Sequence, residues 1–106
     1  MFWTIAVAKL LFSNPEALAR LCRENRIQRL SLFGSTLKGL AREDSDVDLL
    51  VEFEPGAKPG LLRLSQLELE LSKLLGGRKV DLRTAEDLST RFRDEIVRTA
   101  AQQYAA

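Results

Sequence analysis

The sequence predicts an α/β fold: a small mixed, twisted sheet with helices packed mainly on one face. Segments with the apolar pattern of strands lie at 29–33 and 47–53. Segments at 14–25 and 61–75 instead repeat apolar residues with the period of a helix. The two kinds of segment alternate along a chain of 106 residues, a length that suits one modest hydrophobic core. We therefore expect residues 1–106 to form a single domain.

The first helix has a clear start signal in the sequence. Asn14 is a residue type that caps helix N-termini, and Pro15 suits the first helical position. One face of this helix is apolar and is formed by Leu18, Leu21 and Cys22. We expect the helix to end near Asn25.

Two strands should follow this helix. The strand at 29–33 leads into a turn with a short helix at 34–40, and a polar link then leads to a second strand, Val47–Phe53. Every second side chain of that strand is apolar: Val47, Leu49, Val51 and Phe53. Because alternate residues of a strand face the same way, Asp46 and Asp48 should lie on the opposite side.

The second half of the chain should add a loop, two helices and a third strand. The loop at 55–60 holds two prolines and two glycines, and the helix at 61–75 is followed by two glycines. The main apolar stripe of that helix is formed by Leu64, Leu67, Leu71 and Leu74. A short strand is predicted at 78–82, one helical turn at 86–88 and an amphipathic helix at 91–104. The residues in register on this last helix are Phe92, Ile96, Ala100 and Tyr104.

Two further leucines, Leu62 and Leu69, fall outside the main stripe of the 61–75 helix. Either the helix is buried on two sides, or these leucines form a surface for a partner or for a second copy of the chain. The second interpretation leaves a homo-oligomer open.

Composition excludes several classes of protein. With 16 basic and 15 acidic residues the net charge is +1, so the chain lacks the basic character expected of a protein that grips a long nucleic acid. The chain has no histidine and one cysteine, which excludes Cys/His zinc sites and Ser-His or Cys-His nucleophiles. The apolar start at 1–9 is too short to span a bilayer and lacks a basic leader. We therefore expect a cytoplasmic protein with no membrane contact.

The most informative stretch joins Gly34-Ser35 to Asp46-Val47-Asp48 across a spacing of ten residues. Two carboxylates on one side of a strand repel each other unless a cation or hydrogen bonds offset the charge. A glycine beside them lets the backbone approach phosphates, and a serine can donate hydrogen bonds to them. The pattern therefore favours a seat for Mg²⁺ and a nucleoside triphosphate over a solvated strand edge or an Asx turn.

This spacing, Gly-Ser-x₁₀-Asp-x-Asp between two apolar strands, resembles the signature of the DNA polymerase β nucleotidyltransferase superfamily. The surrounding residues resemble its smallest branch, the minimal nucleotidyltransferases, over residues 18–104. The resemblance implies a polymerase-β-type nucleotidyltransferase fold. It also implies two Mg²⁺ ions, with ATP as the nucleotide donor.

Phosphoryl-group transfer through two metal ions needs a further carboxylate near the attacking hydroxyl. Asp81, after an apolar strand residue, matches the third acidic residue of the superfamily. The resemblance makes Asp46, Asp48 and Asp81 both catalytic residues and metal ligands, and gives Gly34, Ser35 and Lys38 to the phosphates. On its own, an aspartate at a strand end such as Asp81 is more often a turn or cap residue, and Lys38 is equally typical of a solvent-facing helix. Leu40 departs from the family, which usually has a polar residue there.

The predicted function is Mg²⁺-dependent transfer of a nucleoside monophosphate, AMP from ATP, to a hydroxyl. The resemblance implies an antitoxin that adenylylates a helical partner protein of the HEPN class. Two alternatives remain open. One is a binding module that neutralises its partner by occlusion without catalysis. The other is nucleotidylation of a small molecule, although the chain has no added domain to enclose one.

Overall fold

The computed structural model describes residues 11–34 and 46–106. Its elements are, in chain order, α1 (Pro15–Glu24), β1 (Ile27–Phe33), β2 (Val47–Phe53), α2 (Leu61–Leu74), β3 (Val80–Arg83), a 3₁₀ turn η2 (Ala85–Asp87), α3 (Thr90–Thr99) and β4 (Ala101–Ala105). The strands form one four-stranded sheet in the order β3-β2-β1-β4. Strand β1 is antiparallel to β2 and β4, whereas β2 and β3 are parallel, so the sheet is mixed as predicted.

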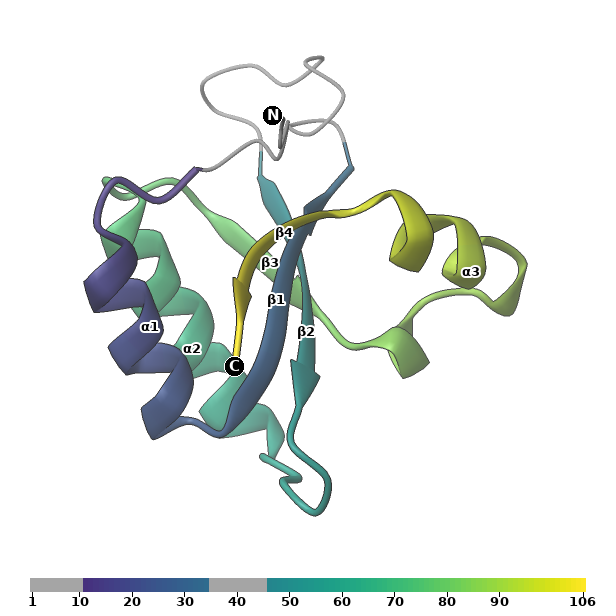
Figure 1. Ribbon diagram of the computed structural model, residues 1–106, viewed down its shortest axis with the longest axis horizontal. Coiled ribbons are helices and arrows are strands. Elements are labelled where there is room, and N and C mark those ends of the chain that lie inside the picture. Colours follow the sequence, from purple (N-terminus) through teal and green to yellow (C-terminus); the bar gives the residue numbers. More distant parts are fainter. Residues whose placement is uncertain (1–10, 35–45) are drawn as a thin grey trace, which may run out of the picture.

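Helices α1 and α2 pack side by side on one face of the sheet, and α3 lies on the other side (Figure 1). The hydrophobic core lies between the sheet and the first two helices, where Leu18 and Cys22 of α1 and Leu67 and Leu71 of α2 are buried. The strand residues in this core are Ile27, Leu30, Leu32, Val47, Leu49, Val51, Val80 and Leu82. We call this side of the sheet the packed face.

The local signals explain several element boundaries. The Asn14 side chain accepts a hydrogen bond from the Ala17 amide at 3.1 Å, so the predicted N-cap is confirmed. Strand β2 has the predicted bounds, and α2 differs from its prediction by one residue. Strand β1 begins two residues earlier than expected, and β3 ends one residue later, at Arg83.

The prediction of a helix over 91–104 is wrong beyond Thr99. Ala100 has φ −63° and ψ 143°, and the chain then pairs with the outer edge of β1, where Tyr104 lies opposite Leu30. Tyr104 packs against the core from this strand. The helix-like spacing of the apolar residues misled the prediction, because pairing along β1 satisfies backbone groups that a longer helix would have left open.

The exposed leucines of α2 exclude one of the two interpretations of that helix. Leu61, Leu62 and Leu69 are 84%, 76% and 65% exposed, so burial on two sides is wrong. A partner or dimer surface stays a prediction. Residues 35–40 of the predicted turn and short helix lie outside the described residues.

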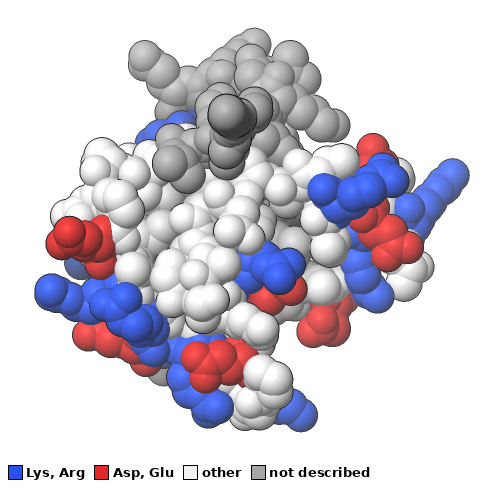
Figure 2. Space-filling model, in the orientation of Figure 1, with Lys and Arg blue, Asp and Glu red and all other residues white. Residues whose placement is uncertain are grey.

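Figure 2 shows basic and acidic side chains interspersed on the face in view, in keeping with the net charge of +1. In the segments 11–34 and 46–106, no helix combines the length and the apolar character needed to cross a membrane.

Candidate active site

The sheet register brings two of the predicted carboxylates to adjacent positions. In the parallel pairing of β2 with β3, Asp48 lies directly opposite Asp81. In the antiparallel pairing of β1 with β2, Asp48 lies opposite Phe33, the residue before Gly34. Paired residues on neighbouring strands face the same side of a sheet, with strands about 4.8 Å apart. Asp48 is therefore placed between the end of β1 and Asp81.

Gly34 is fitted closely to Asp48. Its φ is +79°, a left-handed value that L-residues with a side chain rarely adopt. A Cβ atom added at Gly34 would collide with the Asp48 carboxylate, with Asp48 Cγ only 3.1 Å away. The sequence predicted a glycine here so that the backbone could approach a phosphate. The structure shows another reason for it, because any side chain at position 34 would collide with the Asp48 carboxylate. Its neighbour Ser35, and Lys38, lie outside the described residues.

Asp46 lies at the entrance to β2 and is exposed. The Lys79 ammonium lies 3.9 Å from Asp46 Oδ2, at the upper limit of an ion pair. The Val47 amide donates to the Lys79 carbonyl at 2.8 Å, which holds the start of β2 beside the segment that leads into β3. Backbone pairing therefore places Asp46 near the other two aspartates.

Asp81 is held by a bidentate ion pair with Arg83. The Arg83 Nε lies 3.0 Å from Asp81 Oδ1, and a terminal guanidinium nitrogen lies 3.1 Å from Oδ2. This hydrogen bonding, together with the charge of Asp81, raises the pKa of the Arg83 guanidinium above its ordinary value. Sequence reasoning missed Arg83. Its position two residues after Asp81 on a strand was the available signal, because such residues share a face.

Asp48 has no such partner: within the described residues it makes no ion pair shorter than 4.0 Å. Burial raises the pKa of its carboxyl above the ordinary value, and the negative charges of Asp81 and Asp46 raise it further. Arg83 acts in the opposite direction, as the smallest of the contributions. The site thus concentrates negative charge around Asp48 that the described side chains do not fully offset.

Three carboxylates are the donor set that a hard divalent cation prefers. Gly34 has no side chain, so the space beside the Asp48 carboxylate is not filled from that position. However, no group of three acidic, cysteine or histidine side chains within 11–34 and 46–106 is already gathered around one metal position. Asp81 is turned to Arg83, and Asp46 lies near Lys79. The residues fit a metal site in kind and placement, and their side chains would have to leave these partners to bind one.

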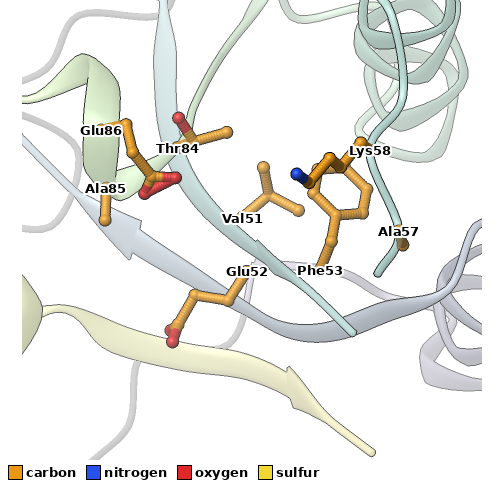
Figure 3. A pocket seen from close by; sticks show the side chains of 8 residues that line it. All are labelled: Val51, Glu52, Phe53, Ala57, Lys58, Thr84, Ala85 and Glu86. Carbon is orange, nitrogen blue, oxygen red and sulfur yellow. The ribbon is translucent and has the colours of Figure 1, made fainter. Parts of the chain in front are cut away.

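A separate cavity of about 320 Å³ lies toward the other end of β2 (Figure 3). Its lining residues are Val51, Glu52, Phe53, Ala57, Lys58, Thr84, Ala85 and Glu86. It lies beyond the Leu50–Arg83 pair, the last pair in the β2–β3 register. None of the three aspartates lines it, so it is not the seat predicted for nucleotide and metal.

The α/β fold and the paired aspartates define a protein of the nucleotidyltransferase class. The family model described as "Nucleotidyltransferase domain" matches residues 15–102, which is most of the chain. The chain belongs to this family. The family resemblance inferred from the sequence is confirmed, as is the predicted fold class.

Among curated relatives, the chain is 42% identical over 72 residues to the protein adenylyltransferase MntA of Thermococcus cleftensis, covering 68% of this chain and 70% of the relative. Among solved structures, one described as a "putative minimal nucleotidyltransferase" has a TM-score of 0.65 and 43% identity, covering 81% of this chain and 85% of that chain. The relatives thus include protein adenylyltransferases, the enzyme class that the sequence predicted.

Two further solved structures are toxin–antitoxin complexes. One contains AMP-PNP, and its matching chain has a TM-score of 0.67 and 25% identity, covering 88% of this chain and 74% of that one. The other is a tri-AMPylated HEPN toxin of Shewanella oneidensis with its MNT antitoxin, at a TM-score of 0.59 and 22% identity, covering 87% and 70%. At that identity the second likeness concerns the fold alone.

Proposed function

We propose that this protein is a Mg²⁺-dependent protein adenylyltransferase that moves AMP from ATP to a hydroxyl group of a HEPN-class toxin, and so acts as the antitoxin of the pair. The observation that carries the proposal is the register that sets Asp48 opposite Asp81, with Gly34 against the Asp48 carboxylate. The protein adenylyltransferase relative and the toxin–antitoxin complex with AMP-PNP support it. In this proposal residues 1–106 act as one nucleotidyltransferase domain.

The roles of the side chains follow from their places on the sheet. Asp46 and Asp48 would supply carboxylate oxygens to the ions that accompany ATP, and Asp81 would contribute the third carboxylate. When bound, Mg²⁺ would neutralise the charge that develops on the phosphates. Ser35 and Lys38 would contact those phosphates, and Gly34 would keep the approach to Asp48 clear.

In the reaction, the acceptor oxygen forms a bond to the α-phosphorus of ATP, and the bond from that phosphorus to the β-phosphate oxygen breaks. Pyrophosphate leaves, and the acceptor carries AMP. The Asp81 carboxylate would hold the acceptor hydroxyl and receive its proton. Because Asp81 lies on the edge strand β3, a hydroxyl carried by another macromolecule has a route to it.

The charge distribution supports a protein as the acceptor. Basic and acidic groups are nearly equal in number and mixed on the face shown in Figure 2, which does not favour a long nucleic acid. Such an enzyme would work where ATP and its partner are made, and we propose the cytoplasm.

The second candidate is an occlusion module that binds the toxin without modifying it. The exposed leucines of α2, Leu61, Leu62 and Leu69, favour this candidate, because exposed apolar side chains of this size are typical of docking surfaces. The two candidates differ in one property: only the enzyme needs the aspartates.

Intact-mass spectrometry of the protein co-expressed with a candidate partner of the HEPN class separates the two. We expect the partner to gain mass in AMP units with the wild type, and none with Asp46→Asn/Asp48→Asn. The matched control is Glu52→Gln, since Glu52 lies on the same side of β2 as Asp48 and pairs with Arg29 at 3.6 Å. If the partner is neutralised equally by all three forms and carries no added mass, the occlusion module replaces the enzyme.

ATP binding gives an independent test of the site. Wild-type protein should bind ATP with Mg²⁺ and much more weakly in chelator, and the double Asn variant should lose that difference. Isothermal titration calorimetry at fixed free Mg²⁺ measures it. Equal affinity for ATP in all these conditions would refute the assignment of the aspartates as metal ligands.

A further inference from the structure

Arg83 is the last residue of β3, and its guanidinium faces the carboxylate proposed as the third metal ligand. The two side chains meet as two parallel forks, at 3.0 and 3.1 Å, so both oxygens of Asp81 are engaged. Bidentate guanidinium–carboxylate pairs are among the stronger charge-assisted hydrogen bonds. The Arg83 side chain is 48% exposed, which leaves it room to move away from Asp81.

The three aspartates therefore differ in how they are occupied. Both oxygens of Asp81 bind Arg83, whereas the one ion pair of Asp46 among the described residues is the 3.9 Å contact with Lys79. Asp48 makes no ion pair among the described residues, although it lies between the other two carboxylates. A divalent cation entering the site thus finds Asp48 available and Asp81 already bound to a cation.

A metal ion that approaches Asp81 from the side that faces Arg83 needs the same oxygen lone pairs that the guanidinium occupies at 3.0 and 3.1 Å, so the two compete for that position. They are also cations, so each lowers the affinity of the carboxylate for the other. Arginine stays protonated throughout the working pH range, so Arg83 cannot leave by losing its charge. It can leave only by displacement.

We propose that Arg83 is the counter-ion of Asp81 in the metal-free protein and that a divalent cation displaces it. Of the two ions that the site binds, the one held more weakly is the one that competes with Arg83 for Asp81, so Arg83 sets the affinity for that ion. This inference rests on the proposed function, because it takes Asp81 to be a metal ligand. On this inference the Arg83–Asp81 ion pair belongs to the metal-free protein. The metal site is then assembled only when metal and nucleotide bind.

Mn²⁺ binding measured by EPR of the free ion, with saturating AMP-PNP, tests the proposal without any transfer reaction. Arg83→Leu should bind the more weakly held Mn²⁺ about two- to tenfold more tightly than wild type, the range expected for removing one competing ion pair. Arg83→Lys should fall between the two, because an ammonium cannot make the same fork. Raising the salt concentration should narrow the difference.

Two controls make the result specific to this pair. Arg26→Leu removes another exposed arginine–carboxylate pair, the 3.5 Å contact with Glu54, and should leave Mn²⁺ affinity unchanged. Lys79→Ala removes the longer contact with Asp46 and should change the affinity less than Arg83→Leu does. If Arg83→Leu does not fold, as judged by circular dichroism, Arg83→Gln takes its place.

A second measurement follows the guanidinium directly. In ¹⁵N–¹H spectra, the Arg83 Nε–H should be protected from exchange in metal-free protein and lose that protection when Mg²⁺ and AMP-PNP are added. The Arg26 Nε–H should not respond.

Unchanged or weaker Mn²⁺ binding by Arg83→Leu would overturn the inference, because Arg83 would then support Asp81 rather than compete for it. The proposed function would survive that result as long as Mn²⁺ binding still depends on Asp48. Should Asp48→Asn bind Mn²⁺ as wild type does, both the function and this inference would fall.

Discussion

On one side of β2, Val47, Leu49 and Val51 are buried against α1 and α2, whereas the other side of the same strand presents Asp48 and Glu52, with the buried Leu50 between them. The first set stabilises the fold, since burying such side chains contributes about 1.5–3 kcal/mol each. Asp48 does the opposite, because it is partly buried, lies beside two other carboxylates and lacks an ion pair within the described residues. One strand thus combines an apolar face that packs against the helices with a face that carries the carboxylate of Asp48, whose charge the described side chains do not fully offset.

This contrast predicts that substitutions on the two faces will affect different measurements. The largest effect is expected at Asp81, where Asp81→Asn should reduce AMP transfer about 10²–10⁴-fold through loss of the group that receives the acceptor proton. Single-turnover transfer to the partner, followed by intact mass, measures the rate. Asp94→Asn on α3 is the control and should transfer normally. Near-normal transfer by Asp81→Asn would mean that another residue activates the acceptor.

On the packed face, Leu49→Ala should lower the free energy of unfolding by about 2–5 kcal/mol, because it leaves a cavity at a position that is fully buried. Urea denaturation measures the loss. Leu62→Ala is the matched control, since Leu62 is 76% exposed, and it should stay within about 0.5 kcal/mol of wild type. Similar losses for the two variants would contradict the one-sided packing of α2.

Gly34 directly follows β1 and lies against the Asp48 side chain. Gly34→Ala should destabilise the protein by about 1–3 kcal/mol, from strain at φ +79° and from the collision with the carboxylate. Gly76 has φ +74°, and no atom of the described residues lies within 4 Å of its added Cβ, so Gly76→Ala should show only the conformational penalty of about 1 kcal/mol. Asp48→Asn in the Gly34→Ala background should not restore stability, because the amide has the same bulk.

Much of this arrangement follows from the sequence, because local signals and tertiary structure agree there. Asn14 and Pro15 mark the start of α1, and the apolar alternation at Val47–Phe53 gives the bounds of β2. The spacing of Asp46 and Asp48 from Gly34-Ser35 predicted a shared site, and the family resemblance added Asp81. The parallel β2–β3 pairing places Asp48 opposite Asp81.

The features that sequence reasoning missed depend on partners distant in the chain. The spacing of Phe92, Ile96, Ala100 and Tyr104 fits a helix, but Tyr104 belongs to a strand because β1 has an edge to be paired. The residues around Tyr104 carry no local signal that β1 has an edge for them to pair with. Arg83 was missed for a related reason: its importance comes from the carboxylate it faces, not from any motif that contains it.

The smallest expected effect concerns the charge of Asp48 itself. Because its pKa is raised in the folded protein, the folded state binds the proton more tightly than the unfolded state does. The resulting destabilisation is absent at pH values below the ordinary pKa of an aspartate and complete above the raised one. In chelator, Asp48→Asn should therefore match wild type below the ordinary aspartate pKa and be more stable than wild type at pH 7.

The pKa of Asp87 is shifted in the opposite direction to that of Asp48, so its charge should stabilise the folded protein. Hydrogen bonds from the Thr84 amide and hydroxyl, at 3.1 and 3.0 Å, lower the pKa of its carboxyl below the ordinary value. That stabilisation is present above the ordinary aspartate pKa and is lost as the pH falls through the lowered one. Asp87→Asn should therefore be less stable than wild type at pH 7, whereas Asp48→Asn should be more stable. Urea denaturation in chelator at both pH values measures the two differences. A loss of stability at pH 7 in both variants would mean that Asp48 is already compensated in the metal-free protein, and that the two faces of β2 differ less than their burial and charges indicate.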